Sequence, residues 1–117
     1  MEGTPLRTLF DSSIVGTAQA LKTSGGRLAA VEISNPNTVS GFLQIFDLAT
    51  GDITMGTTAP KLSLAIPKGA SATDVGIMDK LWKEGIDFNI AISYAITTTA
   101  TGSTAMTTAP VGNFFFL

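Results

Sequence analysis

The chain has 117 residues, of which 44% are hydrophobic and only 14% are charged, and it contains neither cysteine nor histidine. This length supports one hydrophobic core, so we expect a single domain over 1–117. Disulfides, thiolate metal sites, imidazole ligands and Ser-His-Asp triads are all excluded by the two missing residue types. The sequence therefore predicts no cofactor and no metal.

Charge and hydropathy also limit the partners. The net charge is −2, and the seven Lys and Arg residues are dispersed along the chain, so no basic stripe is available to follow a phosphate backbone. No apolar run approaches the roughly 18 residues that a membrane helix needs. We expect no nucleic acid and no membrane as partners.

Short apolar runs with a period of two occur along the chain and are typical of β-strands. The first ten residues, 1–10, are predicted as a short arm that overlaps the first of these runs. Across the turn sequence Asn-Pro-Asn-Thr, 26–35 and 40–49 are predicted to pair as a β-hairpin. The predicted strands are 7–16, 18–24, 26–35, 40–49, 61–67, 71–79, 85–97 and 111–117.

The clearest of these strands is 85–97, in which every second residue from Ile86 to Ile96 is a large apolar one. Helical spacing is nowhere sustained, and Met78, Leu81 and Trp82 allow at most a turn or two of helix. Eight short strands around one core favour two packed sheets. We predict an all-β, single-domain β-sandwich of about eight antiparallel strands, with a jelly roll preferred over an immunoglobulin-like topology.

After the clearest strand comes a tract of Thr, Ala, Gly and Ser, which is open to interpretation as a linker, a glycosylated stalk or a loop. Too few residues follow it for a second domain, and no secretory signal precedes it, so a loop over 97–109 is favoured. Its threonines suit extended backbone. We predict that Thr98, Thr101, Thr104 and Met106 pair with, or lie against, a neighbouring subunit.

The last strand is apolar on both faces. Phe114 and Phe116 share one face, and Phe115 and Leu117 share the other. This pattern fits either a fully buried central strand or a strand with one face on its own core and the other on a neighbouring subunit. We favour the second interpretation and predict all four residues as candidate subunit contacts.

Few residues offer chemistry. Asp47 and Asp52 flank a glycine as Ca²⁺ ligands do in some loops, but Asp and Gly are also ordinary loop residues. The acidic stretch of Asp74, Asp79, Glu84 and Asp87 is interleaved with lysines and is typical of solvated surface. Tyr94 is expected in the core, whereas Trp82 is a candidate ligand contact. We expect no enzymatic activity.

The order GRLAAVEISNPNTVSGFLQIFDLAT, PKLSLAIPKG and GIDFNIAISYAITTTATGSTAMTTAPVGNFFFL resembles small structural proteins of tailed-phage virions. The resemblance covers roughly residues 26 to 117. It implies a jelly-roll or related β-sandwich that decorates or cements the capsid as a homotrimer, and it implies no catalytic residues.

The leading hypothesis is therefore a non-enzymatic decoration protein. It would be made in the host cytoplasm, bind the outer surface of the phage head in the virion, and stabilise contacts between subunits of the major capsid protein. One alternative is a tail or head-fibre module that holds a host surface glycan with Trp82. The weakest alternative is an enzyme that uses Asp79 and Glu84.

Overall fold

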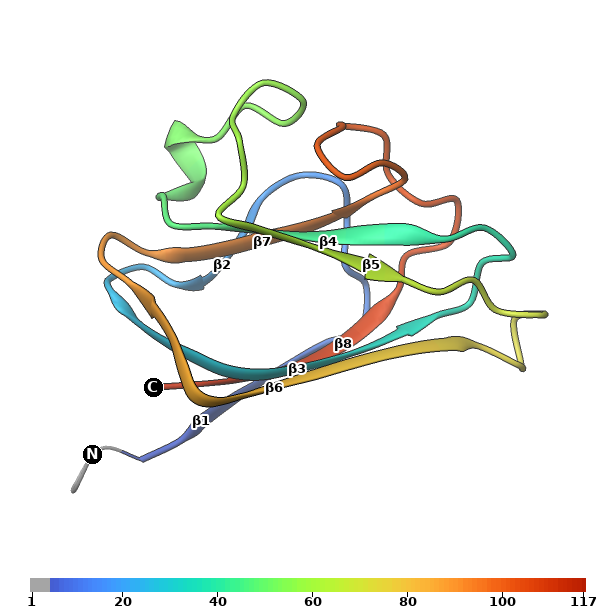
Figure 1. Cartoon of the computed structure of the whole chain (residues 1–117). Coiled ribbons are helices and arrows are strands. Elements are labelled where there is room, and N and C mark those ends of the chain that lie inside the picture. Colours follow the sequence, from blue (N-terminus) through green and yellow to red (C-terminus); the bar gives the residue numbers. More distant parts are fainter. Residues whose placement is uncertain (1–4) are drawn as a thin grey trace.

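The computed structural model describes residues 5–117 and arranges them in two facing four-stranded sheets (Figure 1). One short 3-10 helix, η1 (Thr50–Asp52), lies between two of the strands. The strands are β1 (Arg7–Asp11), β2 (Gln19–Lys22), β3 (Gly26–Asn35), β4 (Gly41–Phe46), β5 (Leu62–Ile66), β6 (Gly76–Phe88), β7 (Ile92–Thr97) and β8 (Val111–Phe116).

The strand order is that of a jelly roll. Sheet I has the order β1-β8-β3-β6, and sheet II has the order β2-β7-β4-β5. Every neighbouring pair is antiparallel, and the pairs β1 with β8, β2 with β7, β3 with β6 and β4 with β5 are nested. The chain thus behaves as one long hairpin whose two arms are rolled into two sheets. The predicted all-β sandwich of eight strands is confirmed.

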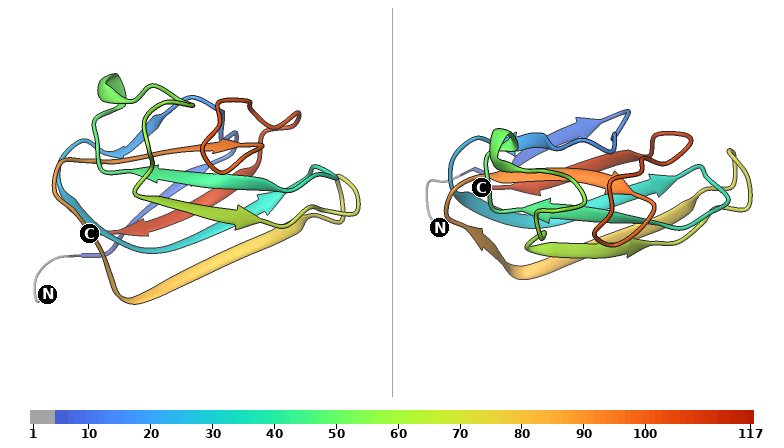
Figure 2. Two further views of the ribbon diagram at one scale, coloured as in Figure 1. Left: turned by 45° about the horizontal axis from the view of Figure 1, so that its top comes forward. Right: turned by 90° about the horizontal axis from the view of Figure 1, so that it is seen from above.

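Figure 2 shows the two sheets from two further directions. The core lies between them and is formed by alternate residues of the strands. Its fully buried members include Leu28 and Ile33 from sheet I and Leu43 and Ile96 from sheet II. Each such side chain contributes about 1.5 to 3 kcal/mol by leaving water.

Tyr94 of β7 joins the two sheets and is buried, as predicted. Its ring centroid lies 4.4 Å from that of Phe114, and its hydroxyl donates to Oδ2 of Asp11 at 2.7 Å. Burial of the hydroxyl, together with the Asp11 carboxylate, raises the pKa of Tyr94. The last strand, the first strand and the centre of sheet II are thereby tied together.

The predicted hairpin of 26–35 with 40–49 is wrong, because β3 belongs to sheet I and β4 to sheet II. The connection between them is held by buried amides. Nδ2 of Asn35 donates to the carbonyls of Val39 and Pro67, while its Oδ1 accepts from the backbone and side chain of Asn37. These bonds satisfy the connecting backbone without a ladder between the two strands, so the chain can cross from sheet to sheet.

The predicted strand 85–97 is also wrong as a single element. The chain turns at residues 89–91, which places the first part in β6 and the second in β7, in different sheets. The carboxylate of Asp47 accepts hydrogen bonds from the N–H groups of Asn89, Ile90 and Ala91 at 3.1, 2.8 and 3.3 Å. The side chain of Asp47, which is far from this turn in the sequence, therefore replaces the strand partner that these backbone N–H groups lack.

Two smaller expectations change as well. Met78, Leu81 and Trp82 lie within β6 rather than in a helical turn. Residues 7–10 of the predicted arm form part of β1, and residues 1–4 lie outside the described part of the chain.

The turn at residues 89–91, which the carboxylate of Asp47 holds, is sensitive to pH. Partial burial alone would raise the pKa of Asp47, but the three backbone donors and the charge of Lys61 outweigh it and hold this pKa below its ordinary value. A folded pKa below the unfolded one means that the carboxylate contributes stability above about pH 4 and loses it as the pH falls further.

We expect Asp47→Ala to lower the free energy of unfolding at neutral pH by about 1.5 to 3 kcal/mol, the usual contribution of hydrogen bonds to a charged group. Urea denaturation at neutral pH and at about pH 3 measures the effect, and the difference from the native chain should shrink in acid. Asp52→Ala, in the exposed η1, is the matched control and should change stability little. Equal losses for the two variants would contradict this role.

Candidate functional site

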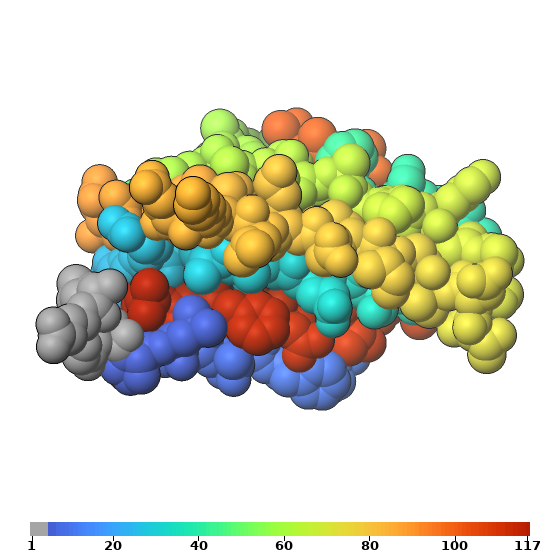
Figure 3. Space-filling model, turned by 60° about the horizontal axis from the view of Figure 1, so that its bottom comes forward, coloured from blue at the N-terminus to red at the C-terminus, as the bar shows by residue number. Residues whose placement is uncertain are grey.

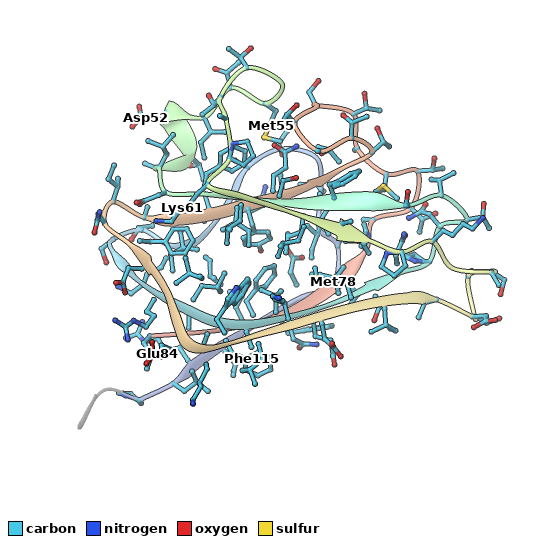
Figure 4. The ribbon with its side chains drawn as sticks, in the orientation of Figure 1. Asp52, Met55, Lys61, Met78, Glu84 and Phe115 are labelled. Carbon is cyan, nitrogen blue, oxygen red and sulfur yellow. The ribbon has the colours of Figure 1, made fainter. Side chains whose placement is uncertain are left out.

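The predicted contact residues of the last strand lie on opposite faces of β8. Phe114 and Phe116 point into the core and are buried, whereas Phe115 points out of sheet I, away from the sandwich (Figure 4). Leu117 follows the strand, is half-buried, and exchanges backbone hydrogen bonds with Arg27. One face of this strand, with Phe114 and Phe116, packs on the core, and the other face, with Phe115, lies on the surface of the described chain.

Phe115 shares the outer face of sheet I with exposed apolar residues of other strands, and Figure 3 shows the side of the molecule on which this face lies. In the strand register, Thr8, Phe115, Ala30 and Leu81 form one row across all four strands. Phe10 and Ile77 also point outward from this sheet, and the row of Phe10 continues through the polar residues Asn113, Glu32 and Asp79. We call this surface the apolar face of sheet I; it comprises Phe10, Ala30, Ile77, Leu81 and Phe115.

Three members of the apolar face are strongly exposed. Leu81 retains 76% of its accessible surface, Phe10 retains 63% and Ile77 retains 49%. Large apolar side chains that share one uncovered sheet face indicate a surface that binds another molecule.

Two carboxylates lie within this face. Glu32 of β3 is directly opposite Asp79 of β6, and both are exposed. Like charges opposite each other on neighbouring strands repel. A partner that places a cationic group over this pair would remove the repulsion.

The outer face of sheet II is covered by the chain itself (Figures 1 and 2). Gln44, fully buried, donates from Nε2 to Oγ1 of Thr97 at 2.6 Å and to the carbonyl of Gly102 at 3.0 Å. Ser63 donates to the carbonyl of Ala100 at 2.7 Å. The segment after β4 also lies on this face, since Ser93 donates to the carbonyl of Leu48 at 2.7 Å.

The threonine tract is thus an ordered loop that packs on its own sheet. It pairs with itself, because the N–H of Thr98 donates to the carbonyl of Thr104 at 2.9 Å. Thr101 and Thr104 are exposed, Thr98 is half-buried, and Met106 is buried in the core. A methyl group on Gly41 would lie 2.7 Å from Sδ of Met106, so this side chain fills a close gap beside β4. Only the exposed threonines of this set face outward as free contact residues.

Trp82 borders a pocket of about 480 Å³ at one end of sheet I. The pocket surrounds a bulge in which four residues of β6, 82–85, lie opposite the single residue Ala29 of β3. Gly85 has a φ of 78° there, and Nε of Arg27 donates to Oδ1 of Asp87 at 2.9 Å. Trp82 itself is half-buried and also packs against the core.

The remaining candidates do not come together. Asp47 binds backbone N–H groups, and Asp52 lies in η1. Asp74 bonds to Ser71 in the turn before β6, Asp79 lies on the apolar face, and Asp87 borders the pocket with Glu84. Within residues 5–117 no group of three Asp or Glu side chains is arranged to hold a metal ion. No helix in the same range is long and apolar enough to cross a membrane.

Comparison of the chain with family models, with curated proteins and with solved structures finds no match in any of the three.

The bulge at Gly85 supports the pocket through a backbone conformation that glycine adopts without strain. Gly85→Ala should lower the free energy of unfolding by about 1 to 2 kcal/mol, because φ is positive and a Cβ would overlap the side chain of Arg27. Thermal or chemical denaturation measures this change. Gly51→Ala is the control, since no other atom lies within 4 Å of its added methyl group; an equal loss at both positions would contradict the assignment.

Proposed function

We propose that this protein is a non-enzymatic structural component of a virus particle, a decoration or cement protein on the outer surface of a phage head. The observation that carries the proposal is the contrast between the two outer faces of the sandwich. Sheet II is covered by the chain's own loops, whereas sheet I exposes Phe10, Ile77 and Leu81.

The exposed face suits a contact of ordinary size. Stable protein interfaces bury about 800 Å² on each partner and combine an apolar centre with a polar rim. The row from Thr8 to Leu81 crosses the full width of sheet I, and the charged residues around the bulge border one end of it. On a closed shell, many weak contacts of this kind act together through effective concentration.

The carboxylates of Glu32 and Asp79 support a partner other than a second copy of this chain. If two copies met face to face, each copy would bring the same acidic pair toward the other, and the repulsion would increase. A different protein with an apolar surface and a basic side chain suits it better. We assign that place to the major capsid protein.

We expect Leu81→Glu to abolish co-sedimentation with expanded capsids and to leave the fold unchanged, because the side chain is exposed on an edge strand. Val39→Glu, at an exposed apolar residue on the connection between β3 and β4, is the matched control and should bind as the native chain does. Thermal melting of both variants checks the fold. Binding that survives Leu81→Glu, or is lost equally in Val39→Glu, would contradict the use of this face.

The homotrimer implied by the resemblance and the edge-paired dimer proposed in the next subsection are alternative assemblies. Their test is the mass of the purified protein in solution, which is 12.1 kDa for one chain.

The second candidate, a tail or head-fibre module that holds a host glycan, is favoured by the pocket beside Trp82. Arg27, Glu84 and Asp87 supply both hydrogen-bond donors and acceptors there, as recognition of sugar hydroxyls requires.

Because Trp82 is the single tryptophan of the chain, its fluorescence reports on this pocket alone. If the module binds sugars, titration with neutral pyranoses should shift the emission saturably, and Asp87→Asn should weaken the binding about tenfold, as loss of one charge-assisted hydrogen bond does. Asp79→Asn, away from the pocket on the same strand, is the control. A flat titration with every sugar in the panel removes this candidate.

A further inference from the structure

We propose that β1 is a docking edge for a second copy of this chain, and that two copies pair antiparallel through β1 about a two-fold axis. The inference concerns the backbone edge of sheet I and is tested on the purified chain, so it does not rest on the proposed capsid contact, although Phe10 belongs to both surfaces. It would join the two copies of sheet I into one continuous eight-stranded sheet.

A sheet edge presents unpaired N–H and C=O groups, and proteins usually protect such edges. Three of the four edge strands here are protected. β2 has four residues and a register shift between Ala20 and Lys22. β5 lies between Pro60 and Pro67, and the threonine loop bonds to its Ser63.

The third protected edge is β6. The bulge over 82–85 interrupts its register, and Lys80 and Lys83 are exposed along it. Lysines and bulges are two of the devices that keep an edge from pairing with another strand.

β1 has neither a bulge nor a lysine, although it is as short as β5, follows Pro5 and carries two charged residues of opposite sign, Arg7 and Asp11. All five of its residues are in unbroken register with β8, from Arg7 opposite Phe116 to Asp11 opposite Gly112. The strand contains no proline, glycine or lysine. It runs along the outer edge of the molecule, as the view from above shows (Figure 2), and three of its five residues are exposed.

The sequence of β1 is complementary to itself. In an antiparallel pair centred on Leu9, Arg7 of each copy lies opposite Asp11 of the other, and Thr8 lies opposite Phe10. Opposite charges, and an aromatic residue opposite a β-branched one, stabilise such a pair, and a two-fold axis repeats every contact. Like charges never meet in this register.

The side chain of Asp11 has capacity for the added contact. It accepts from the N–H of Ser13 at 2.9 Å and from the hydroxyl of Tyr94 at 2.7 Å, whereas an ionised carboxylate offers about four acceptor positions. Arg7 is exposed at the opposite end of the strand. The pairing therefore adds a partner to Asp11 without displacing those that hold the fold.

The first test is the mass in solution. Sedimentation equilibrium should give a reversible dimer of the 12.1 kDa chain. Phe10→Lys should weaken dimerisation about tenfold, because the two-fold axis makes each loss count twice. Val39→Lys, at an exposed apolar residue on the connection between β3 and β4, is the control and should leave the dimer intact. A monomer at all concentrations, or the trimer that the resemblance implies, would overturn the proposal.

The second test fixes the register and does not depend on the stability of one variant. The chain has no cysteine, so introduced thiols are the only ones present. On oxidation, a mixture of Thr8→Cys and Phe10→Cys chains should form a mixed disulfide dimer more rapidly than either variant alone, because these positions lie opposite each other only between copies. Val39→Cys is the control for random collision. Cross-linking no faster than this control would also overturn the proposal.

Discussion

The last strand holds sheet I together, because β8 lies between β1 and β3 and supplies the ladder for both. Its inward residues Phe114 and Phe116 complete the core, and the ring of Phe114 contacts Tyr94 of the opposite sheet. The same alternation turns Phe115 outward. Without β8, neither the apolar face nor the edge at β1 would exist.

The outer faces of the two sheets differ, because the chain's own loops lie over sheet II whereas the outer face of sheet I is open to solvent. Over sheet II, backbone carbonyls in the loops after β4 and β7 accept hydrogen bonds from Oγ of Ser93 and Nε2 of Gln44. Over sheet I, no loop of the described chain takes that place, and apolar side chains meet solvent. The molecule therefore has one side that its own loops cover and one side where exposed apolar residues indicate contact with another molecule.

Elements whose pattern reflects local burial were predictable. The strands at 26–35 and 111–117 and the buried position of Tyr94 follow from period-two alternation, since each residue's side is decided by its immediate neighbours. Elements that depend on distant groups were not. The break after Phe88 requires the carboxylate of Asp47, and the crossing from β3 to β4 requires the amides of Asn35 and Asn37. Nothing in 85–97 or 26–49 alone signals these contacts.

The candidate contact residues show the same division between features set by neighbouring residues and features set by distant groups. Alternation separates Phe115 from Phe114 and Phe116, but it cannot say which of the two faces has a core beneath it. Met106 lies in a polar tract, and it is buried beside Gly41 because the loop after β7 packs there. The sequence by itself determined an all-β chain of about eight strands, because hydrophobic periodicity is a local property. The tertiary structure alone decided strand partners, the covered face and the open edge, because these depend on contacts between residues far apart in the chain.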